Sequence, residues 1–224
     1  PTGYPYKNVE VSLSYFASMF GARAVLWMQG ETDTAPGIPN YQEYYDYIGF
    51  VIGQSRIDFG HNIPWVMTRT SWIDGLSSDL VLQAQQDLIN TPGLNVFEGP
   101  FTDNLMIPRF DFVHFGNTSN VNGLDILGNA WNESLNDSFF QNSQPIQTDP
   151  FVQFRTSCGF LATNINLPQG TSPYNWSDNG SGEFRSGSSG TFSAIVRDQN
   201  NNFKFTNLIN LGLIPHTGTV NAVS

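Results

Sequence analysis

Two short motifs in this 224-residue chain combine residue types that support acyl-transfer chemistry. The first, Gln29-Gly30-Glu31, directly follows the apolar run 23–28. A glutamine amide at a strand end can donate a hydrogen bond to a developing oxyanion, and a glycine beside it lets the backbone approach closely. The second motif holds Asp111 and His114, spaced so that the carboxylate can orient the imidazole. Such a histidine takes a proton from a hydroxyl nucleophile and returns it to the leaving group.

The elements that must position these motifs alternate between helical and strand patterns. Helices are predicted at 8–20, 40–59, 78–90 and 119–139, and short apolar strands at 23–28, 63–68 and 94–97. This alternation is typical of a parallel sheet covered by helices on both faces. The loops at the carboxyl ends of such strands form the site, and both motifs fall in loops of this kind. Because three strands leave a hydrophobic edge open, we expect further strands on sequence preceding residue 1.

The pattern changes near Gln144. Residues 151–155, 190–198 and 202–213 alternate or run apolar, and the stretches between them are rich in turn residues. We therefore expect an α/β domain over 1–143 and a small all-β module over 144–224.

Composition narrows the classes of partner. The chain has 19 acidic and 9 basic residues, a formal net charge of −10, which excludes nucleic acid and anionic membranes as partners. No apolar run approaches the roughly 20 residues that span a bilayer. The single cysteine excludes an intrachain disulfide. A neutral, hydroxyl-rich partner such as a glycan fits this surface better.

The two motifs resemble those of a known family. WMQGETD at 27–33 looks like the W-x-Q-G-E-x-D signature of the sialate O-acetylesterase and acetylxylan esterase branch of the SGNH hydrolases. DFVHF at 111–115 looks like the closing D-x-x-H block of that family, and LQAQ at 82–85 resembles the helix between the two. The resemblance covers roughly residues 8–138.

The resemblance implies a flavodoxin-like three-layer α/β/α SGNH-hydrolase fold that acts on acetylated carbohydrate, with no metal and no cofactor. It makes His114 the general base, Asp111 its orienting partner and Gln29 an oxyanion donor. It assigns Gly30 and Glu31 to the substrate-binding loop, with Glu31 bracing that loop rather than reacting.

One part of the family pattern has no counterpart here. The nucleophilic serine of the family lies in a G-D-S or G-Q-S block after the first strand, and nothing before Gln29 matches that block. Gly53-Gln54-Ser55 has the letters, but it falls on the last turn of a helix before a strand, which is the opposite of the context a nucleophile needs. We expect the serine on upstream sequence.

The module has its own resemblance. Residues 174–202 look like the Y-x-W-S-(D)-N-G pattern of Ig-like repeats in secreted proteins of Bacteroidetes. This likeness implies an Ig-like β-sandwich with Trp176 in its core and a hairpin turn at Asp198-Gln199-Asn200. It also implies a secreted or cell-surface protein in which the module is a spacer or contacts glycan, with the spacer role favoured.

The leading hypothesis is a carbohydrate esterase that removes acetyl groups by a Ser-His-Asp mechanism. The alternative is a non-catalytic secreted surface protein or envelope-assembly subunit on the same scaffold, and a third reading is a related lipase or thioesterase. Four residues stay open between substrate contact and a surface or core role: Trp27, Asp33, Trp72 and Asp103.

Overall fold

The computed structural model describes residues 4–34, 40–105, 109–118, 120–149, 151–158, 163–187 and 189–211. Contacts divide the chain into two compact units. The first holds Pro1–Leu13 and Gly21–Gln147, and the second holds Ser14–Phe20 and Thr148–Ser224. The first unit combines helices with a parallel sheet and the second is built mainly of strands, so the chain is mixed α/β, as expected.

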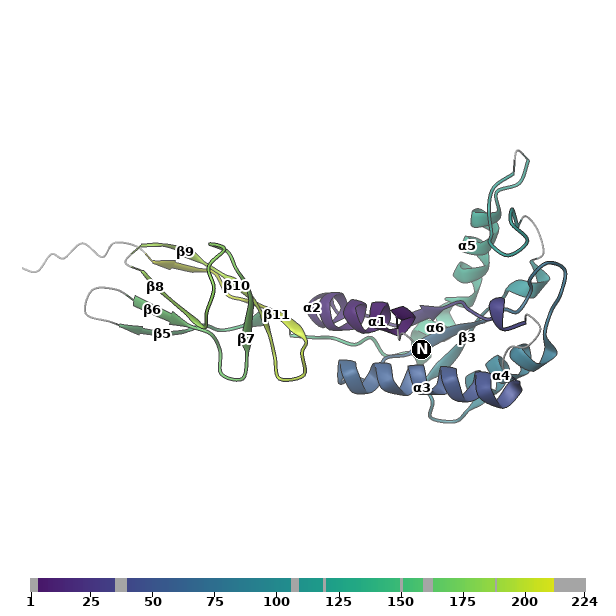
Figure 1. Cartoon of the computed structure of the whole chain (residues 1–224), viewed down its shortest axis with the longest axis horizontal. Coiled ribbons are helices and arrows are strands. Elements are labelled where there is room, and N and C mark those ends of the chain that lie inside the picture. Colours follow the sequence, from purple (N-terminus) through teal and green to yellow (C-terminus); the bar gives the residue numbers. More distant parts are fainter. Residues whose placement is uncertain are drawn as a thin grey trace, which may run out of the picture. The chain divides into compact units, whose positions relative to one another are not determined.

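The first unit is built on three parallel strands in the order β1 (Val25–Trp27), β2 (Trp65–Arg69) and β3 (Val96–Phe101) (Figure 1). The central strand β2 is buried on both faces from Trp65 to Thr68, in keeping with its apolar run Trp65-Val66-Met67. The edge strand β1 differs, because Leu26 is 50% exposed. Within the described residues, β1 pairs with β2 alone.

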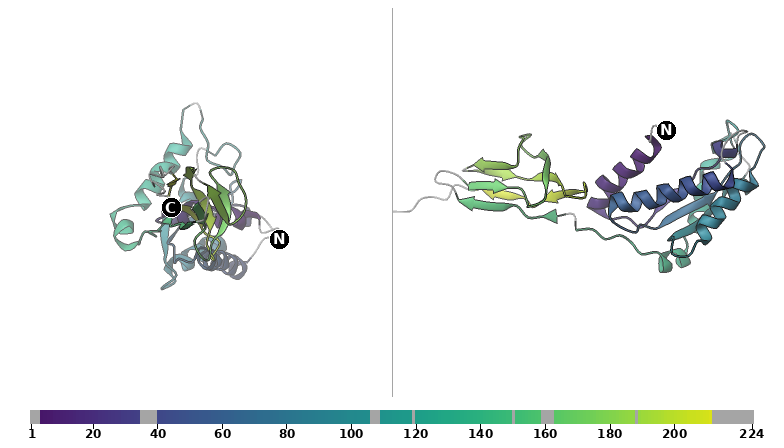
Figure 2. Two further views of the ribbon diagram at one scale, coloured as in Figure 1. Left: turned by 90° about the vertical axis from the view of Figure 1, so that its left-hand side faces the viewer. Right: turned by 60° about the horizontal axis from the view of Figure 1, so that its bottom comes forward.

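Two helices, α3 (Tyr41–Phe59) and α4 (Asp79–Asn90), pack side by side in this unit (Figure 2). The α3 helix begins at a capping box in which the Asn40 side chain accepts from the Glu43 amide and the Glu43 carboxylate accepts from the Asn40 amide. It ends at Gly60, which takes a left-handed φ of 74°. These are the bounds that the sequence predicts for this helix.

The predicted helix at 119–139 is two helices, α5 (Gly123–Ser134) and α6 (Asp137–Asn142). Asn136 divides them, since its side chain caps α6 by accepting from the Phe139 amide. The inward position expected for Leu124 is also wrong, since this residue is 55% exposed. In α6, Phe139 is buried and meets Phe97 of β3 edge-to-face, with 5.3 Å between ring centroids.

The first helical run also departs from its predicted register. It consists of α1 (Tyr4–Val11), a π-helical stretch η1 (Ser12–Ala17) and the short α2 (Ser18–Phe20). A π-helix has more residues per turn, so the 3.6-residue spacing is lost across it. Phe16 and Phe20, which the spacing predicts on the buried face, are 57% and 72% exposed.

The described residues of the second unit form nine short strands in three sheets. The strands are β4 (Phe151–Val152), β5 (Arg155–Cys158), β6 (Thr163–Asn166), β7 (Ser172–Trp176), β8 (Phe184–Gly187), β9 (Gly190–Phe192), β10 (Ala194–Arg197), β11 (Phe203–Thr206) and β12 (Ile209–Leu211). Their orders are β4-β11-β10-β7, β12-β9 and β5-β6-β8.

This unit confirms two predictions, the buried position of Trp176 and the hairpin turn at Asp198. Trp176 is 1% exposed, stacks on Phe154 at 5.4 Å and donates its indole N–H to the Gly182 carbonyl at 2.8 Å. Antiparallel β10 and β11 are joined by the predicted hairpin turn, in which Asp198 accepts from the amides of Asn200 and Asn202. Both contacts follow from residue types the sequence displays, a large apolar ring and an Asx turn.

Candidate active site

The carboxyl ends of the three parallel strands bring three loops together. The Gln29 loop follows β1, the loop 70–78 follows β2, and residues 102–105 and 109–115 come after β3. Hydrogen bonds and ring contacts link each of these loops to the next, as the rule for parallel sheets predicts.

A buried glutamine of α4 joins the first two loops. The Gln85 amide accepts from the Thr70 N–H at 2.8 Å and donates to the Thr70 carbonyl at 2.8 Å and to the Gln29 carbonyl at 3.1 Å. The Tyr44 hydroxyl adds a second donor to Gln29 O at 2.8 Å, and burial raises the pKa of this phenol. Gln85 is fully buried, so these bonds fix the loop from inside.

Gly30 lies in the interior of this loop. Its φ is 155°, and a Cβ there would fall 2.2 Å from the Thr70 carbonyl oxygen and 2.6 Å from Gln85 Nε2. Glu31, one residue on, accepts a 3.1 Å hydrogen bond from the Thr70 hydroxyl. Glycine is thus required by packing and Glu31 has the expected bracing contact, while the substrate-binding roles of both residues stay predictions.

The Gln29 side chain faces a neighbouring carboxylate. Its Nε2 donates to Asp33, and its Oε1 lies 3.4 Å from the Tyr44 hydroxyl. A primary amide has two N–H donors. In the described part of the chain Asp33 accepts from one of them, and no protein acceptor takes the other.

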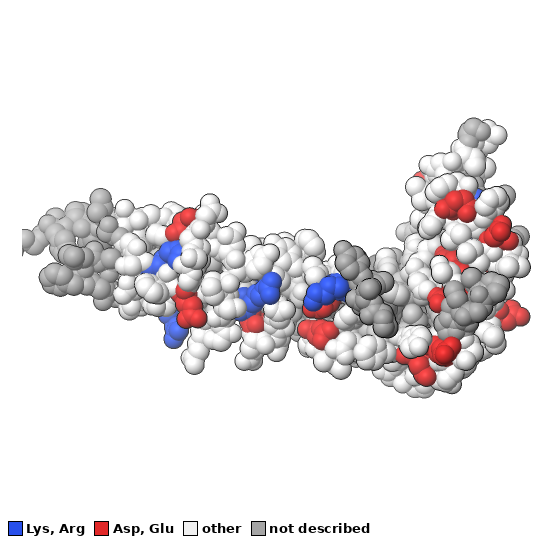
Figure 3. Space-filling view, viewed as in Figure 1, with Lys and Arg blue, Asp and Glu red and all other residues white. Residues whose placement is uncertain are grey.

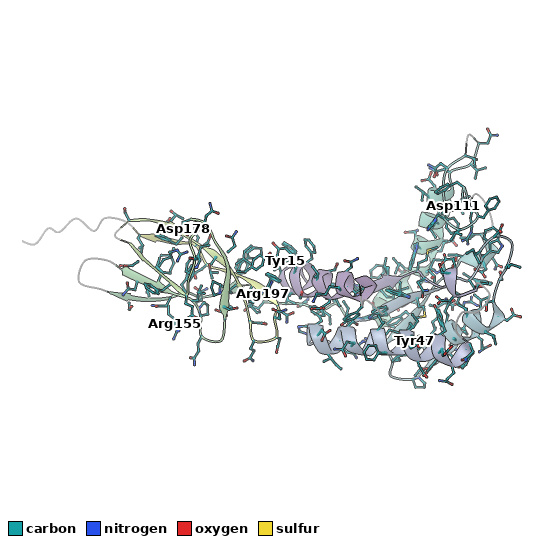
Figure 4. All side chains as sticks on the ribbon, in the orientation of Figure 1. Tyr15, Tyr47, Asp111, Arg155, Asp178 and Arg197 are labelled. Carbon is teal, nitrogen blue, oxygen red and sulfur yellow. The ribbon has the colours of Figure 1, made fainter. Side chains whose placement is uncertain are left out.

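An apolar cavity of about 270 Å³ adjoins Gln29. Trp27, Tyr47 and Val51 line it, and Figure 4 labels Tyr47 on α3. Trp27 therefore borders a space next to the expected oxyanion donor instead of lying fully in the core.

Asp111 and His114 form the expected pair (Figure 4 labels Asp111). The Asp111 Oδ2 atom lies 2.6 Å from His114 Nδ1, and Oδ1 accepts from the His114 and Val113 amides at 2.7 and 3.1 Å. The hydrogen bond from the imidazole, followed by those from the backbone, lowers the pKa of Asp111 to about 2. The His114 side chain is 73% exposed, so its Nε2 is accessible.

Arg109 holds this third loop to the end of β3. Its guanidinium donates to the Val113 carbonyl at 2.7 Å and to the Thr102 carbonyl at 3.0 Å. It lies 4.9 Å from the centre of the Trp72 indole and 4.4 Å from that of the Phe115 ring. Trp72 therefore contacts a buried cation of the site.

Arg109 interacts electrostatically with carboxylates of the other strand-end segments, Glu31 after β1 and Asp103 after β3. Burial lowers the pKa of Arg109, while the negative charges of Glu31 and Asp103 oppose that shift. Asp103 itself is buried and accepts from the Ser71 amide and hydroxyl, both at 2.7 Å, and from the Trp72 amide at 3.0 Å. Asp103 is thus an internal anchor of the β2 loop, and the solvated surface role that the sequence favoured for it is wrong.

The described residues contain no hydroxyl that bonds the His114 imidazole. Ser55, rejected as a nucleophile from sequence, is fully buried on α3 and donates to the Ile52 carbonyl at 2.8 Å. The two motifs also share no direct hydrogen bond in the described ranges. Arg109 is linked to both, since it donates to the Val113 carbonyl and interacts electrostatically with Glu31.

Sequence reasoning missed Arg109 and assigned no contact to Gln85 or Tyr44. Gln85 did carry a signal, because it occupies the inward face of α4 with Val81, Ala84 and Leu88. A polar residue on such a face needs internal partners.

No protein family, curated protein or solved structure matches this chain. The part of the chain that the structure describes holds no cluster of three or more His, Cys, Asp or Glu side chains suited to a metal ion. Among the described helices, none is both long and apolar enough to cross a membrane.

Proposed function

We propose that this chain is the histidine-bearing part of a carbohydrate esterase that removes acetyl groups from a glycan. The observation that carries the proposal is the 2.6 Å Asp111–His114 pair, held by Arg109 in the same set of strand-end loops as the Gln29 amide. The serine is proposed to lie on upstream sequence, because no described hydroxyl bonds His114.

Each group then has one step in the reaction. As the serine oxygen attacks the acetyl carbonyl, His114 Nε2 takes the hydroxyl proton, and Asp111 on Nδ1 stabilises the imidazolium. The free N–H of Gln29 donates to the tetrahedral oxyanion. The imidazolium returns the proton to the sugar oxygen, which leaves as a hydroxyl group. Water repeats the sequence on the acetyl-serine and releases acetate.

The open edge of the sheet supports this placement of the serine. Leu26 on β1 and Tyr47 and Phe50 on α3 are at least half exposed, and the apolar cavity beside Gln29 borders the same elements. Further strands beside β1 would cover this surface and complete a flavodoxin-like three-layer SGNH fold.

A neutral glycan suits the charge of the surface. Figure 3 shows Asp and Glu side chains scattered over the α/β unit, in keeping with the formal charge of −10. Such a surface repels polyanions. The stranded unit, proposed as an Ig-like spacer, favours a secreted or cell-surface location.

The test is acetate release from acetylated xylan and from O-acetylated sialic acid by the protein with its upstream sequence. We expect His114→Ala to lower kcat/KM at least about a thousandfold, while His61→Ala, a histidine outside the site, leaves it unchanged. Full activity in His114→Ala would overturn the assignment.

The competing function is a non-catalytic surface protein on the same scaffold. It is favoured by the exposed His114 imidazole, which has no hydroxyl partner in the described residues. Acetate release that a serine-directed inhibitor abolishes would exclude this reading. No release from either substrate by the complete protein would favour it.

A further inference from the structure

A second, larger cavity of about 630 Å³ is lined by residues of β3, at the sheet edge opposite β1, and of the helices α5 and α6. Figure 1 labels these three elements. Its apolar lining comes from Phe97, Phe101 and Phe139, which are buried or partly buried. Its polar lining is exposed and includes Glu98 and Glu133. The cavity, termed the β3 groove below, thus has an apolar floor and a polar rim.

The charges of the β3 groove exclude anionic ligands. Two carboxylates line it, and none of its lining residues is a lysine, arginine or histidine. Beside this lining, the guanidinium of Arg69 lies 4.6 Å from the centre of the Phe101 ring and is neutralised by Glu98. Glu98 is paired with Arg69 at 2.7 Å, so Glu133 is the one carboxylate of the lining without a cation beside it. A single free carboxylate is too few for a divalent cation, which takes six or more oxygen ligands.

The β3 strand itself disfavours a peptide that adds to the sheet. Pro100 lies within β3 and has no N–H to donate to a neighbouring strand. Gly99 is pressed against β2, since a Cβ there would lie 2.8 Å from the Met67 carbonyl oxygen. An edge interrupted in this way blocks strand addition.

We propose that the β3 groove binds a segment of a neutral oligosaccharide. The apolar faces of sugar rings would pack on the phenylalanine floor, and sugar hydroxyls would donate to Glu133 and to the amide oxygen of Asn142, whose Nδ2 is bonded to the Ser138 carbonyl. None of the candidate catalytic residues lines this groove. It is a separate glycan site, and it needs no ester chemistry.

The test is a titration of the full chain with xylohexaose, cellohexaose and mannohexaose, followed by NMR and calorimetry. At least one of them is expected to bind saturably with a Kd on the order of 1 mM or lower. Glu133→Arg places a long cation in the groove and is expected to raise that Kd roughly tenfold or more. Asp46→Arg makes the same charge change on an exposed site of α3, outside the groove, and should leave the Kd unchanged.

Two results would overturn the proposal. One is the absence of saturable binding by all three sugars at about 10 mM. The other is an equal loss of affinity in Asp46→Arg or a selective loss in His114→Ala, which would place the binding elsewhere. Binding that persists in a protein without acetylesterase activity would keep the groove and reject the proposed reaction.

Discussion

Arg109 determines how the Asp111–His114 loop meets the rest of the candidate site. It is 9% exposed, lies against two aromatic rings and donates to two backbone carbonyls. Hydrogen bonds from a charged donor contribute about 1.5–3 kcal/mol each, and a buried acceptor left unpaired adds to the loss. Arg109→Ala is therefore expected to lower the free energy of unfolding by about 2–4 kcal/mol.

Urea denaturation measures this change, and NMR of the His114 ring reports the loop. Arg109→Lys keeps the charge but loses the planar fork, so it should restore only part of the stability. The exposed Arg155 of the second unit provides a control, and Arg155→Ala should change stability by less than about 0.5 kcal/mol. An Arg109→Ala protein as stable as this control, with unchanged His114 signals, would remove Arg109 from the site.

Asp111 should give the loop a pH dependence at the acid end. Its pKa is about 2 in the folded chain against an ordinary 3.8, so the ionised carboxylate favours the folded loop. This contribution is fully present above pH 3.8 and is lost as the pH falls through about 2. NMR shifts of the Val113 and His114 amides should follow this titration. Asp111→Asn should abolish it, and a midpoint near 3.8 in the unmodified protein would contradict the hydrogen-bonded geometry.

At the scale of the elements, α3 shows what local sequence can predict. Asn40, Glu43 and Gly60 set its start and end through short-range contacts, and these were readable as a capping box and a helix stop. Asn40→Ala should lower the free energy of unfolding by about 1 kcal/mol, because the first turn loses its side-chain cap. Thermal or urea unfolding checks this, with the exposed Gln42→Ala as the matched control. Equal stability of the two variants would show that the cap contributes little.

The elements that were predicted poorly depend on interactions that spacing does not show. The π-helical turn at Ser12–Ala17 changes the register of the first helical run and leaves Phe16 exposed. The break at Asn136 replaces an α-helical continuation with a second cap. A π-helical turn in the first case and a new N-cap in the second differ little in free energy from a continued α-helix. The spacing of apolar residues therefore cannot decide between the two arrangements.

The candidate site divides in the same way. Asp111 and His114 are only three positions apart, so their contact could be predicted from the sequence. The contacts of Arg109 with Trp72 and Thr102 join loops that follow different strands, and only the folded sheet brings them together. The chemistry read from residue types stays a prediction, whereas the network of contacts among the loops could be seen only in the tertiary structure.

At the scale of the whole molecule, each compact unit has its own buried core. Ile52 is fully buried in the first unit, and Trp176 is 1% exposed in the second. Truncating a buried isoleucine costs about 2–5 kcal/mol and a buried tryptophan about 3–5 kcal/mol. Because the two cores share no residue, Ile52→Ala should lower the thermal transition of the α/β unit, and Trp176→Ala that of the stranded unit.

Differential scanning calorimetry with unit-specific NMR signals distinguishes the two transitions. We expect Trp176→Ala to leave the Asp111–His114 hydrogen bond intact, since every described contact of that pair lies in the first unit. A spacer role for the stranded unit requires this independence, because a spacer supports no part of the reaction. If Trp176→Ala also melted the α/β unit, folding of the two units would be coupled. The stranded unit would then be part of the structural support of the site.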